Sequence, residues 1–414
     1  MESPQHSAPS GSDAAARSRR IVHALVLLVF MVTAAVGVFG GDRLRYPDER
    51  AYDALARSLV AGNGYTTPEG APTAFRPPGW PMILAGVYQL WPHPVAAKVF
   101  NAAAYAGAAA LLSVLAARIH PSARPLVPLL MLGYPLGLYT ASTLYPQTWG
   151  TLLLAAILVL LWRRGSLIWH GLLAGILLGL LILAIPSFML VTPLILSGAA
   201  IAGSREWRRF LLRSLLVLLC ATAIIAPWTW RNGRIFGRII PVSTNGGLNL
   251  LIGNSAQSGP NSGVNTDVSS YLAGTKGMNE AEMDAHCRRE AMAWATNNPG
   301  AWMKLYAAKV VNHFHYRNDL YVREEQTPFR SAVMAGTYYP LLALAAAGLM
   351  FKRKSSLTPP EIALHVLYWG NALTSALVFT RIRFRLPFDP LLMVLAASIL
   401  ARWRALWNRP HSAC

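Results

Sequence analysis

One polar stretch, from Tyr46 to Pro81, combines side chains suited to acid–base and phosphate chemistry. It contains three neighbouring acids, Asp48, Glu49 and Asp53. A carboxylate within hydrogen-bond reach of a hydroxyl can take its proton. The stretch also contains Arg76 directly before a double proline, and the planar guanidinium group of arginine matches the oxygens of a phosphate. These residue types predict half of an active site, with the other half supplied by loops distant in the sequence.

The composition places this stretch between membrane segments. Of the 414 residues, 54% are hydrophobic and only 13% are charged, whereas ordinary soluble domains carry about 25% charged residues. This deficit, together with many long apolar runs, predicts a polytopic α-helical membrane protein. In a soluble protein the formal net charge of +19 would suggest nucleic acid. Basic loops of a membrane protein explain the charge here, and we expect no nucleic-acid partner.

The apolar runs predict about ten transmembrane helices in an all-α integral membrane bundle. The expected spans lie at about 21–40, 95–117, 126–139, 148–162, 167–184, 187–202, 210–228, 331–351, 361–379 and 386–400. Those within 21–228 form the expected core, and those within 331–405 the C-terminal helices. Residues 1–20, which are polar and rich in small side chains, predict a disordered cytoplasmic tail, and residues 406–414 a second tail.

Two polar regions connect the spans. The first outer loop, residues 41–94, contains two short helical patterns at 49–60 and 80–91, which predict helices lying at the membrane interface. The outer insert, residues 229–330, is too long for a plain connector. It contains an amphipathic helical pattern at 280–296.

The basic residues orient the chain. Alternate loops carry Arg118, Arg124, Arg163, Arg164, Arg205, Arg208, Arg209, Lys352, Arg353, Lys354, Arg402, Arg404 and Arg409. The short opposite loops near 142–147 and 185–186 carry no lysine or arginine. This bias predicts that both termini lie in the cytoplasm. The first outer loop, the outer insert and residues 381–385 then share the outer side, where orientation does not account for their basic residues.

Metal and hydrolase motifs are not found in the sequence. Three cysteines without a CxxC spacing argue against a zinc site or a disulfide framework. There is no GxGxxG, GxxxxGK[ST], GxSxG or HExxH pattern. His313 and His315 flank Phe314, but no cysteine or matched acid accompanies them, so contact with the membrane surface or an acceptor is the preferred interpretation. No metal ligand is assigned, and a divalent cation at the acids of the first outer loop remains open.

Three segments carry a family resemblance. The first combines Asp48, Glu49 and Tyr52 with LARSLVAGNGY and FRPPGWP; the second is PWTWRNGRIFGRIIPVSTNGGLNLLIGN, Pro227–Asn254; the third is RFRLPFDPLL, Arg383–Leu392. Together they resemble the family 39 membrane glycosyltransferases of the GT-C fold, which include protein O-mannosyltransferases and bacterial aminoarabinose transferases. The resemblance covers nearly the whole chain in order and hydropathy, except for the part of the outer insert after Gly259.

The resemblance implies a multi-pass transferase of the bacterial inner membrane. It would move a sugar from a polyprenyl-phosphate donor to a lipid, glycan or protein acceptor on the periplasmic side, with inversion at the sugar. Members of the family use an acid of the first outer loop as the base and basic residues to hold the lipid phosphate. The identities of the sugar and the acceptor stay open.

The resemblance assigns roles in the first outer loop. Asp48 is the expected base, although an acid at this position also suits a helix N-cap. Glu49 could be the base, a metal ligand or a residue that orients substrate. Arg76 is the expected phosphate ligand. Tyr52 is expected to contact substrate or to anchor the loop at the interface, and Asp53 to lie on a solvated face.

The remaining site residues come from distant segments. Arg231 is a candidate phosphate or substrate contact. Arg383 and Arg385 are candidate ligands of the donor phosphate, with lipid headgroups as the alternative partner. We therefore expect Arg76, Arg231 and one of the arginines of the RIRFR segment to converge near Asp48.

Two other functions fit a membrane protein of this kind. A flippase or other transporter of lipid-linked sugars should show polar residues within its spans, and this chain concentrates them in the outer loops instead. A non-catalytic scaffold would not need acids and arginines gathered on one face. We therefore favour the glycosyltransferase and keep the flippase as the alternative.

Overall fold

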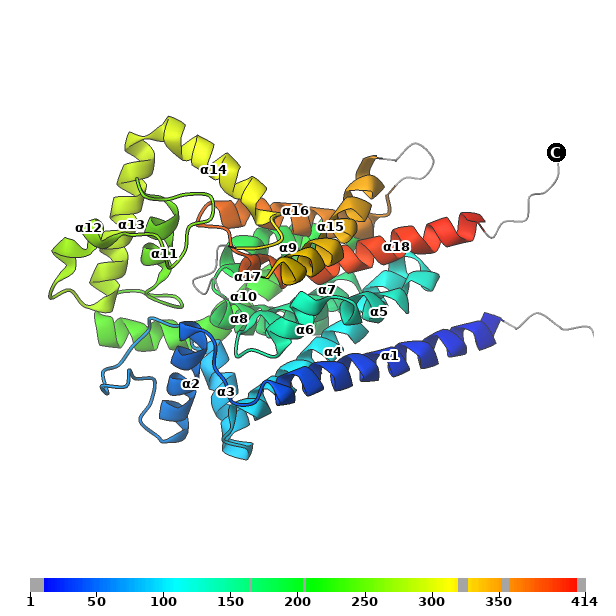
Figure 1. The fold of residues 1–414 in the computed structure, drawn as a ribbon, viewed down its shortest axis with the longest axis horizontal. Helices are drawn as coiled ribbons and strands as arrows, with labels where there is room; N and C mark the ends of the chain where they lie inside the picture. The colour runs from blue at the N-terminus through cyan, green and yellow to red at the C-terminus, as the bar shows by residue number, and fades with distance from the viewer. Residues whose placement is uncertain (1–10, 164, 204–205, 319–326, 351–356, 408–414) are drawn as a thin grey trace, which may run out of the picture.

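The chain folds into a bundle of helices with a smaller group of helices at one end (Figure 1). A computed structural model describes residues 11–163, 165–203, 206–318, 327–350 and 357–407. Within this part the secondary structure is helical, and the only β pairing is an isolated bridge between Thr66 and Pro72. The expected all-α architecture is confirmed.

Five of the described helices are long and apolar enough to cross a membrane. They are α1 (Gly11–Phe39), α4 (Pro94–Ile119), α8 (Leu167–Ala184), α10 (Trp207–Phe236) and α15 (Pro328–Met350). Two shorter apolar helices, α7 (Gln147–Trp162) and α9 (Phe188–Ala202), lie among them. Helix α1 runs along the long axis in Figure 1. Together these apolar helices indicate a multi-pass membrane protein.

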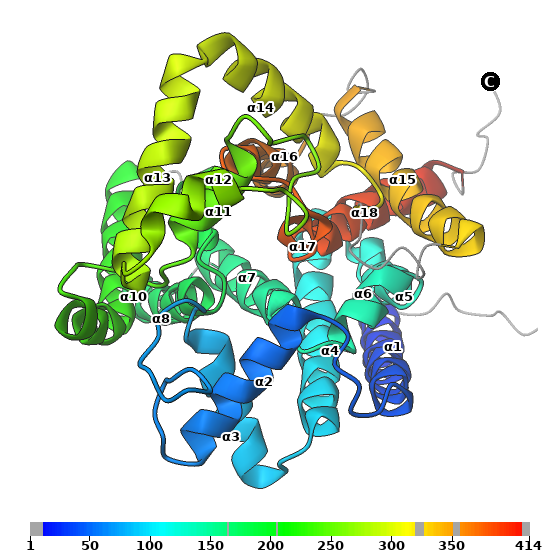
Figure 2. The same cartoon turned by 60° about the vertical axis from the view of Figure 1, so that its left-hand side comes forward.

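The other helices complete the bundle and form the group at its end. They are α2 (Pro47–Val60), α3 (Gly79–Leu90), α5 (Leu126–Leu132), α6 (Pro135–Ala141), α11 (Gly246–Gly253), α12 (Ser269–Leu272), α13 (Glu280–Asn297), α14 (Pro299–His313), α16 (Pro359–Ala376), α17 (Ile382–Arg385) and α18 (Asp389–Trp407), with 3-10 turns at Pro121–Ala123 and Ala273–Thr275. Figure 1 places α2, α11, α12 and α13 at the same end of the molecule, and Figure 2 shows that end turned forward, with α2 below and the other three above. The helices expected at 49–60, 80–91 and 280–296 are therefore present.

Three elements differ from the expectation. The single span expected at 126–139 is two short helices, α5 and α6, because Pro135 has a fixed φ and no backbone N–H to continue the first. Residues 11–20, expected to be disordered, belong to α1, whereas residues 1–10 lie outside the described residues. Helix α10 continues eight residues past the expected end of its span, to Phe236.

Part of the charge pattern that predicted the orientation also lies outside the described residues. This applies to Arg164, Arg205, Lys352, Arg353, Lys354 and Arg409. The expected topology, with cytoplasmic termini, therefore stays a prediction.

Close helix packing fixes the base of the first outer loop. A Cβ atom on Gly79, the first residue of α3, would lie 2.7 Å from the backbone nitrogen of Ala184, at the end of α8. Only glycine permits this approach. The neighbouring Trp80 is fully buried, and its indole N–H donates to the carbonyl of Leu144 at 2.7 Å. The turn that carries Arg76 is therefore anchored against two other parts of the bundle.

Candidate active site

Asp48 lies in the first turn of α2, which begins at Pro47. Proline suits this position because its missing N–H would have no partner there and its φ is already helical. A carboxylate in the first turn also faces the positive end of the helix dipole. The fold thus presents Asp48 at the start of a helix, in the first outer loop.

Glu49 fixes the start of α2 rather than pointing into an open site. Its Oε2 accepts hydrogen bonds from the backbone N–H groups of Arg45 and Tyr46, both at 2.9 Å. Its Oε1 accepts from the N–H of Leu144, also at 2.9 Å, and the side chain is buried. Glu49 therefore joins the first outer loop to the short loop that precedes α7.

Two arginines bind the carboxylate of Asp48. Nη2 of Arg76 lies 2.6 Å from Oδ1, and Nη1 of Arg383, in α17, lies 2.7 Å from Oδ2. The hydroxyl of Tyr145 donates to the same Oδ2 at 3.1 Å. Three distant segments meet here, and two of the expected basic residues converge on the expected base.

The arginines control the protonation of this cluster. Burial acts to raise the pKa of Asp48, but the charges of Arg383 and Arg76 outweigh it and hold the pKa below its usual value. Asp48 is therefore ionised at neutral pH. Burial and the Asp48 charge raise the pKa of Tyr145, so its hydroxyl keeps the proton that it donates.

Aromatic rings support the arginines. The guanidinium carbon of Arg76 lies 5.8 Å from the ring centre of Tyr52 and 5.3 Å from that of Phe75. That of Arg383 lies 5.1 Å from the ring of Phe384. Such contacts orient a guanidinium group while leaving its outer N–H groups available. Tyr52, expected to contact substrate or to anchor the loop, lies buried against Arg76.

The structure does not bring Arg231 into contact with Asp48. Its Nη1 donates to the carbonyl of Thr73 at 2.7 Å, and its Nη2 to the carbonyl of Tyr65 at 3.0 Å. Its guanidinium carbon lies 4.6 Å above the ring centre of Trp228. Arg231 thus binds the backbone of the first outer loop at Tyr65 and Thr73, on the N-terminal side of Arg76.

Arg385 also lies apart from Asp48. It is fully buried and forms an ion pair with Asp389, with Nε to Oδ1 at 2.9 Å. It donates further hydrogen bonds to the carbonyls of His313 and His315. The reason is local: residues 382–385 form a helical turn, so that two positions turn a side chain by about 200°. Arg383 and Arg385 therefore point in nearly opposite directions.

The two histidines differ in their surroundings. His313 is buried and His315 exposed. Burial, together with the charge of Arg385, lowers the pKa of His313 to about 3, so its ring is neutral.

Asp53, expected on a solvated face, pairs with Arg57 at 2.8 Å and accepts a hydrogen bond from Tyr88 at 2.7 Å.

The carboxylate oxygens of Asp48 and Glu49 already have protein partners. Among the described residues, no group of three or more histidine, cysteine, aspartate or glutamate side chains is placed to hold an ion. Both oxygens of Asp48 already face guanidinium groups, and those of Glu49 face backbone N–H groups. The divalent cation considered from the sequence stays an untested prediction.

Tyr145 is the member of the cluster that the sequence did not indicate. It lies in an uncharged loop between two apolar segments. The one feature of the sequence that pointed to Tyr145 was its position, because the expected topology places its short loop on the same side of the membrane as Asp48.

Comparison with known proteins identifies the fold. No family model matches the chain, and no curated protein matches it. Among solved structures, it is similar to ArnT from Cupriavidus metallidurans bound to undecaprenyl phosphate, with a TM-score of 0.57 over 92% of this chain at 13% identity. It is also similar to the Archaeoglobus fulgidus oligosaccharyltransferase in the apo form, with a TM-score of 0.56 over 94% of this chain at 12% identity.

The chain has a GT-C fold. It spans 59% of the length of the ArnT chain and 52% of that of the oligosaccharyltransferase chain. The GT-C fold expected from the sequence is confirmed, whereas membership of family 39 stays a prediction. In this GT-C bundle, the Asp48 cluster lies where the first outer loop meets α17.

Proposed function

We propose that this chain is a membrane glycosyltransferase that takes a sugar from a polyprenyl-phosphate donor. The observation that carries the proposal is the Asp48 carboxylate held between Arg76 and Arg383 in a GT-C fold. ArnT, one of the similar structures, binds undecaprenyl phosphate. An acid next to two arginines supplies the two groups that such a transfer needs, a base and a phosphate-binding site.

Arg76 and Arg383 are the proposed ligands of the donor phosphate. Each uses one nitrogen on Asp48, and each guanidinium has five N–H groups in total. Both side chains keep some exposure, 22% for Arg76 and 34% for Arg383. A phosphate can therefore reach their remaining N–H groups, and these would stabilise the negative charge that develops on the leaving phosphate.

Asp48 is the proposed base. The acceptor hydroxyl oxygen forms a bond to the anomeric carbon while the bond from that carbon to the phosphate oxygen breaks. The bonding electrons leave with the polyprenyl phosphate, and the hydroxyl proton goes to Asp48. Because this is a single displacement, the configuration at the anomeric carbon inverts. When phosphate draws the two arginines away, the pKa of Asp48 rises and the carboxylate becomes a better base.

The proposed location is the inner membrane of a bacterium, with both termini in the cytoplasm and the Asp48 cluster on the periplasmic side. The charge bias of the sequence supports this orientation. The acceptor is then a hydroxyl group of an envelope lipid, glycan or protein, and the apolar surface of the bundle contacts membrane lipids.

A transfer assay tests the proposal. Purified wild type and Asp48→Asn are incubated with radiolabelled sugar on a polyprenyl-phosphate donor and with membrane extract as acceptor. Asp53→Asn is the matched control, because Asp53 lies on the same helix and pairs with Arg57 instead. We expect transfer by the wild type and by Asp53→Asn, and a loss of about 10²-fold or more in Asp48→Asn.

Two results would contradict the proposal. Equal transfer by the wild type and Asp48→Asn would remove Asp48 as the base. Wild type that moves lipid-linked sugar across vesicles, yet transfers it to no acceptor, would establish the flippase instead.

A further inference from the structure

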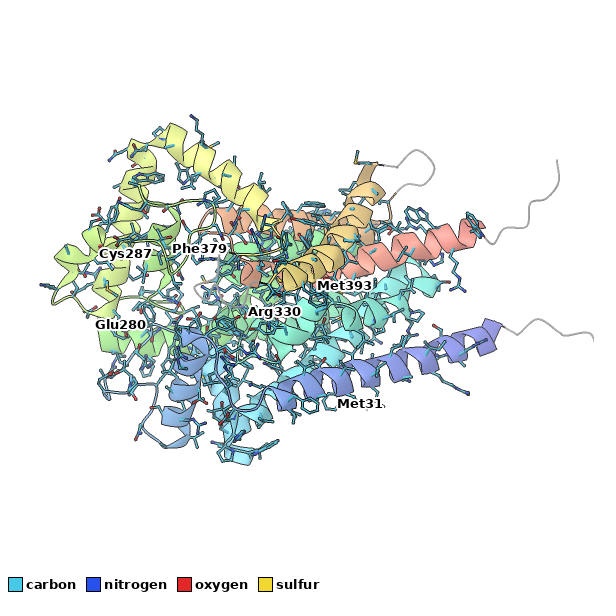
Figure 3. The ribbon with its side chains drawn as sticks, in the orientation of Figure 1. Met31, Glu280, Cys287, Arg330, Phe379 and Met393 are labelled. Atoms are coloured by element: carbon cyan, nitrogen blue, oxygen red, sulfur yellow. The ribbon has the colours of Figure 1, made fainter. Side chains whose placement is uncertain are left out.

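The backbone that leads into Arg76 is bound by a residue of the outer insert. Glu280 is the first residue of α13, and Figure 3 labels it in the end group of the molecule, toward the first outer loop. Its Oε1 accepts a hydrogen bond from the Thr73 hydroxyl at 2.6 Å, and its Oε2 accepts from the Ala74 N–H at 2.8 Å. Both carboxylate oxygens therefore bind the loop, two and three residues before Arg76.

A third segment joins the same contact. Thr244 lies between α10 and α11, and its hydroxyl donates to Oε2 of Glu280 at 3.1 Å. Its backbone N–H donates to the carbonyl of Ala74 at 3.0 Å. Ala74 and Thr244 are at most 1% exposed. Glu280 itself is half-buried, and hydrogen bonds to a charged group are stronger than neutral ones.

The other peptide groups around Arg76 are bound as well. Arg231 donates to the carbonyl of Thr73 at 2.7 Å, and the Phe75 N–H donates to the Thr73 hydroxyl at 3.0 Å. On the far side, the hydroxyl of Tyr65 donates to the carbonyl of Arg76 at 2.9 Å. The two prolines after Arg76 have a fixed φ. The backbone at Arg76 therefore has little freedom to shift while these bonds persist, although the long side chain can still turn from Asp48 to a phosphate.

Glu280 is not needed to cap its own helix. Oδ1 of Asn279 accepts from the N–H groups of Ala281 and Glu282, each at 3.0 Å. Oε2 of Glu282 accepts from the N–H of Asn279 at 3.0 Å. This reciprocal pair is a complete capping box, so the carboxylate of Glu280 is left to bind the loop.

We propose that Glu280 is a positioning residue for recognition of the donor phosphate, acting through Arg76. The inference rests on the proposed function, because it assigns Arg76 to the phosphate. It gives part of the outer insert a direct structural effect on the site. Glu280 itself touches neither the donor nor the acceptor.

Binding of undecaprenyl phosphate to the purified full chain in detergent tests the inference. The variants are Glu280→Gln, Arg76→Gln and their combination, with Glu282→Gln as the control that weakens the cap of the same helix. A glutamine at 280 keeps the shape but replaces one acceptor oxygen by an NH₂ group. We expect binding about tenfold weaker in Glu280→Gln, unchanged binding in Glu282→Gln, and a double variant no weaker than Arg76→Gln alone.

Transfer kinetics give a second readout. Glu280→Gln should raise the KM for the polyprenyl-phosphate donor and change kcat much less, because the base is untouched. Thr73→Val removes the hydrogen bond to Glu280 from the loop side, together with that from the Phe75 N–H, and it should act in the same direction. This second variant keeps the test meaningful if Glu280→Gln folds poorly.

The outcomes separate this inference from the proposed function. Wild type that binds no undecaprenyl phosphate would overturn both. Wild type that binds, together with Glu280→Gln that binds equally well, would overturn the positioning role alone. The same holds if the losses from Arg76→Gln and Glu280→Gln simply multiply in the double variant, because Glu280 would then act independently of Arg76.

Discussion

Asp48 and Arg383 are 335 positions apart in the chain, yet their side chains form an ion pair of 2.7 Å. This contact closes the site between the first outer loop and the segment before the last helix. In the proposed reaction the same arginine must also serve the donor phosphate. The proposed base and the proposed phosphate ligands are therefore in contact before any substrate binds.

Replacing Arg383 should weaken donor binding. Arg383→Gln removes a charged, two-pronged phosphate ligand, and we expect the Kd for undecaprenyl phosphate to rise about tenfold or more. Arg383→Lys should recover only part of this loss because an ammonium group lacks the planar fork. Arg381→Gln is the control, since Arg381 contacts Asn265 instead. Direct binding measurements compare the three, and equal Kd values for Arg383→Gln and Arg381→Gln would exclude the phosphate role.

The acid limb of the pH–rate profile should report Asp48. The two arginines lower its pKa, so the carboxylate stays ionised down to below the usual aspartate range. Removing one arginine weakens this effect, so in Arg76→Gln the fall of kcat/KM on the acid side should begin at a higher pH. Profiles of kcat/KM for wild type and Arg76→Gln check this. An acid limb that stays in place, or moves to lower pH, would contradict the assignment.

The same pKa has a consequence for stability. A carboxyl group whose folded pKa is depressed stabilises the fold above its unfolded pKa, and that contribution is lost as pH falls through the folded value. Between these two values, thermal unfolding of the wild type should become easier with each step of acidification, and that of Asp48→Asn should respond less. Unfolding temperatures of both proteins measured over this acidic range test the prediction. Parallel curves of unfolding temperature against pH would show that Asp48 makes no such contribution to stability.

We expect Glu49 to stabilise the fold and not to take part in the transfer step. Glu49→Gln cannot accept all three backbone hydrogen bonds, and each buried N–H left without a partner costs about 1–3 kcal/mol. We expect a lower unfolding temperature, with the folded fraction still transferring sugar. Thermal unfolding and transfer are measured on the same preparation, after normalisation to folded protein. A stable Glu49→Gln without transfer would instead make Glu49 the base.

Breaking the buried ion pair of Arg385 and Asp389 should destabilise the fold far more than breaking a surface ion pair. Asp389→Ala leaves the buried Arg385 without its charged partner, which costs about 3–5 kcal/mol. Replacing both residues, as in Arg385→Met with Asp389→Leu, should be much less harmful because no buried charge remains. Unfolding temperatures and yields of the single and double variants test this, and a double variant less stable than Asp389→Ala would refute it.

The sequence alone was sufficient to single out the charged loop residues that meet in the structure. Asp48, Arg76 and Arg383 stood out because charges are scarce in this chain and these could not be explained by membrane orientation. It was insufficient where local geometry decides the direction of a side chain. The sequence offered both Arg383 and Arg385 as phosphate ligands, but the helical turn of α17 and the partner Asp389, four residues after Arg385, direct Arg385 into the bundle.

Arg231 and Glu280 show a second limit. Arg231 appeared to follow the end of a span, but α10 continues past it, and its guanidinium reaches backbone carbonyls that no sequence pattern marks. Glu280 binds Thr73 and Ala74 across more than 200 residues. Contacts to backbone groups leave no complementary residue to search for, so the sequence does not reveal them.

The role of Asp48 as the base is tested most directly by single-turnover transfer in wild type and Asp48→Asn, with enzyme in excess over the labelled donor and at a concentration that binds all of it. Binding of undecaprenyl phosphate is measured on the same samples. Loss of the Asp48 charge leaves both arginines free for phosphate, so Asp48→Asn should bind at least as tightly as wild type. Its transfer step should be slower by about 10²-fold or more. A transfer step of unchanged rate in a variant that binds normally would contradict the role of Asp48 as the base.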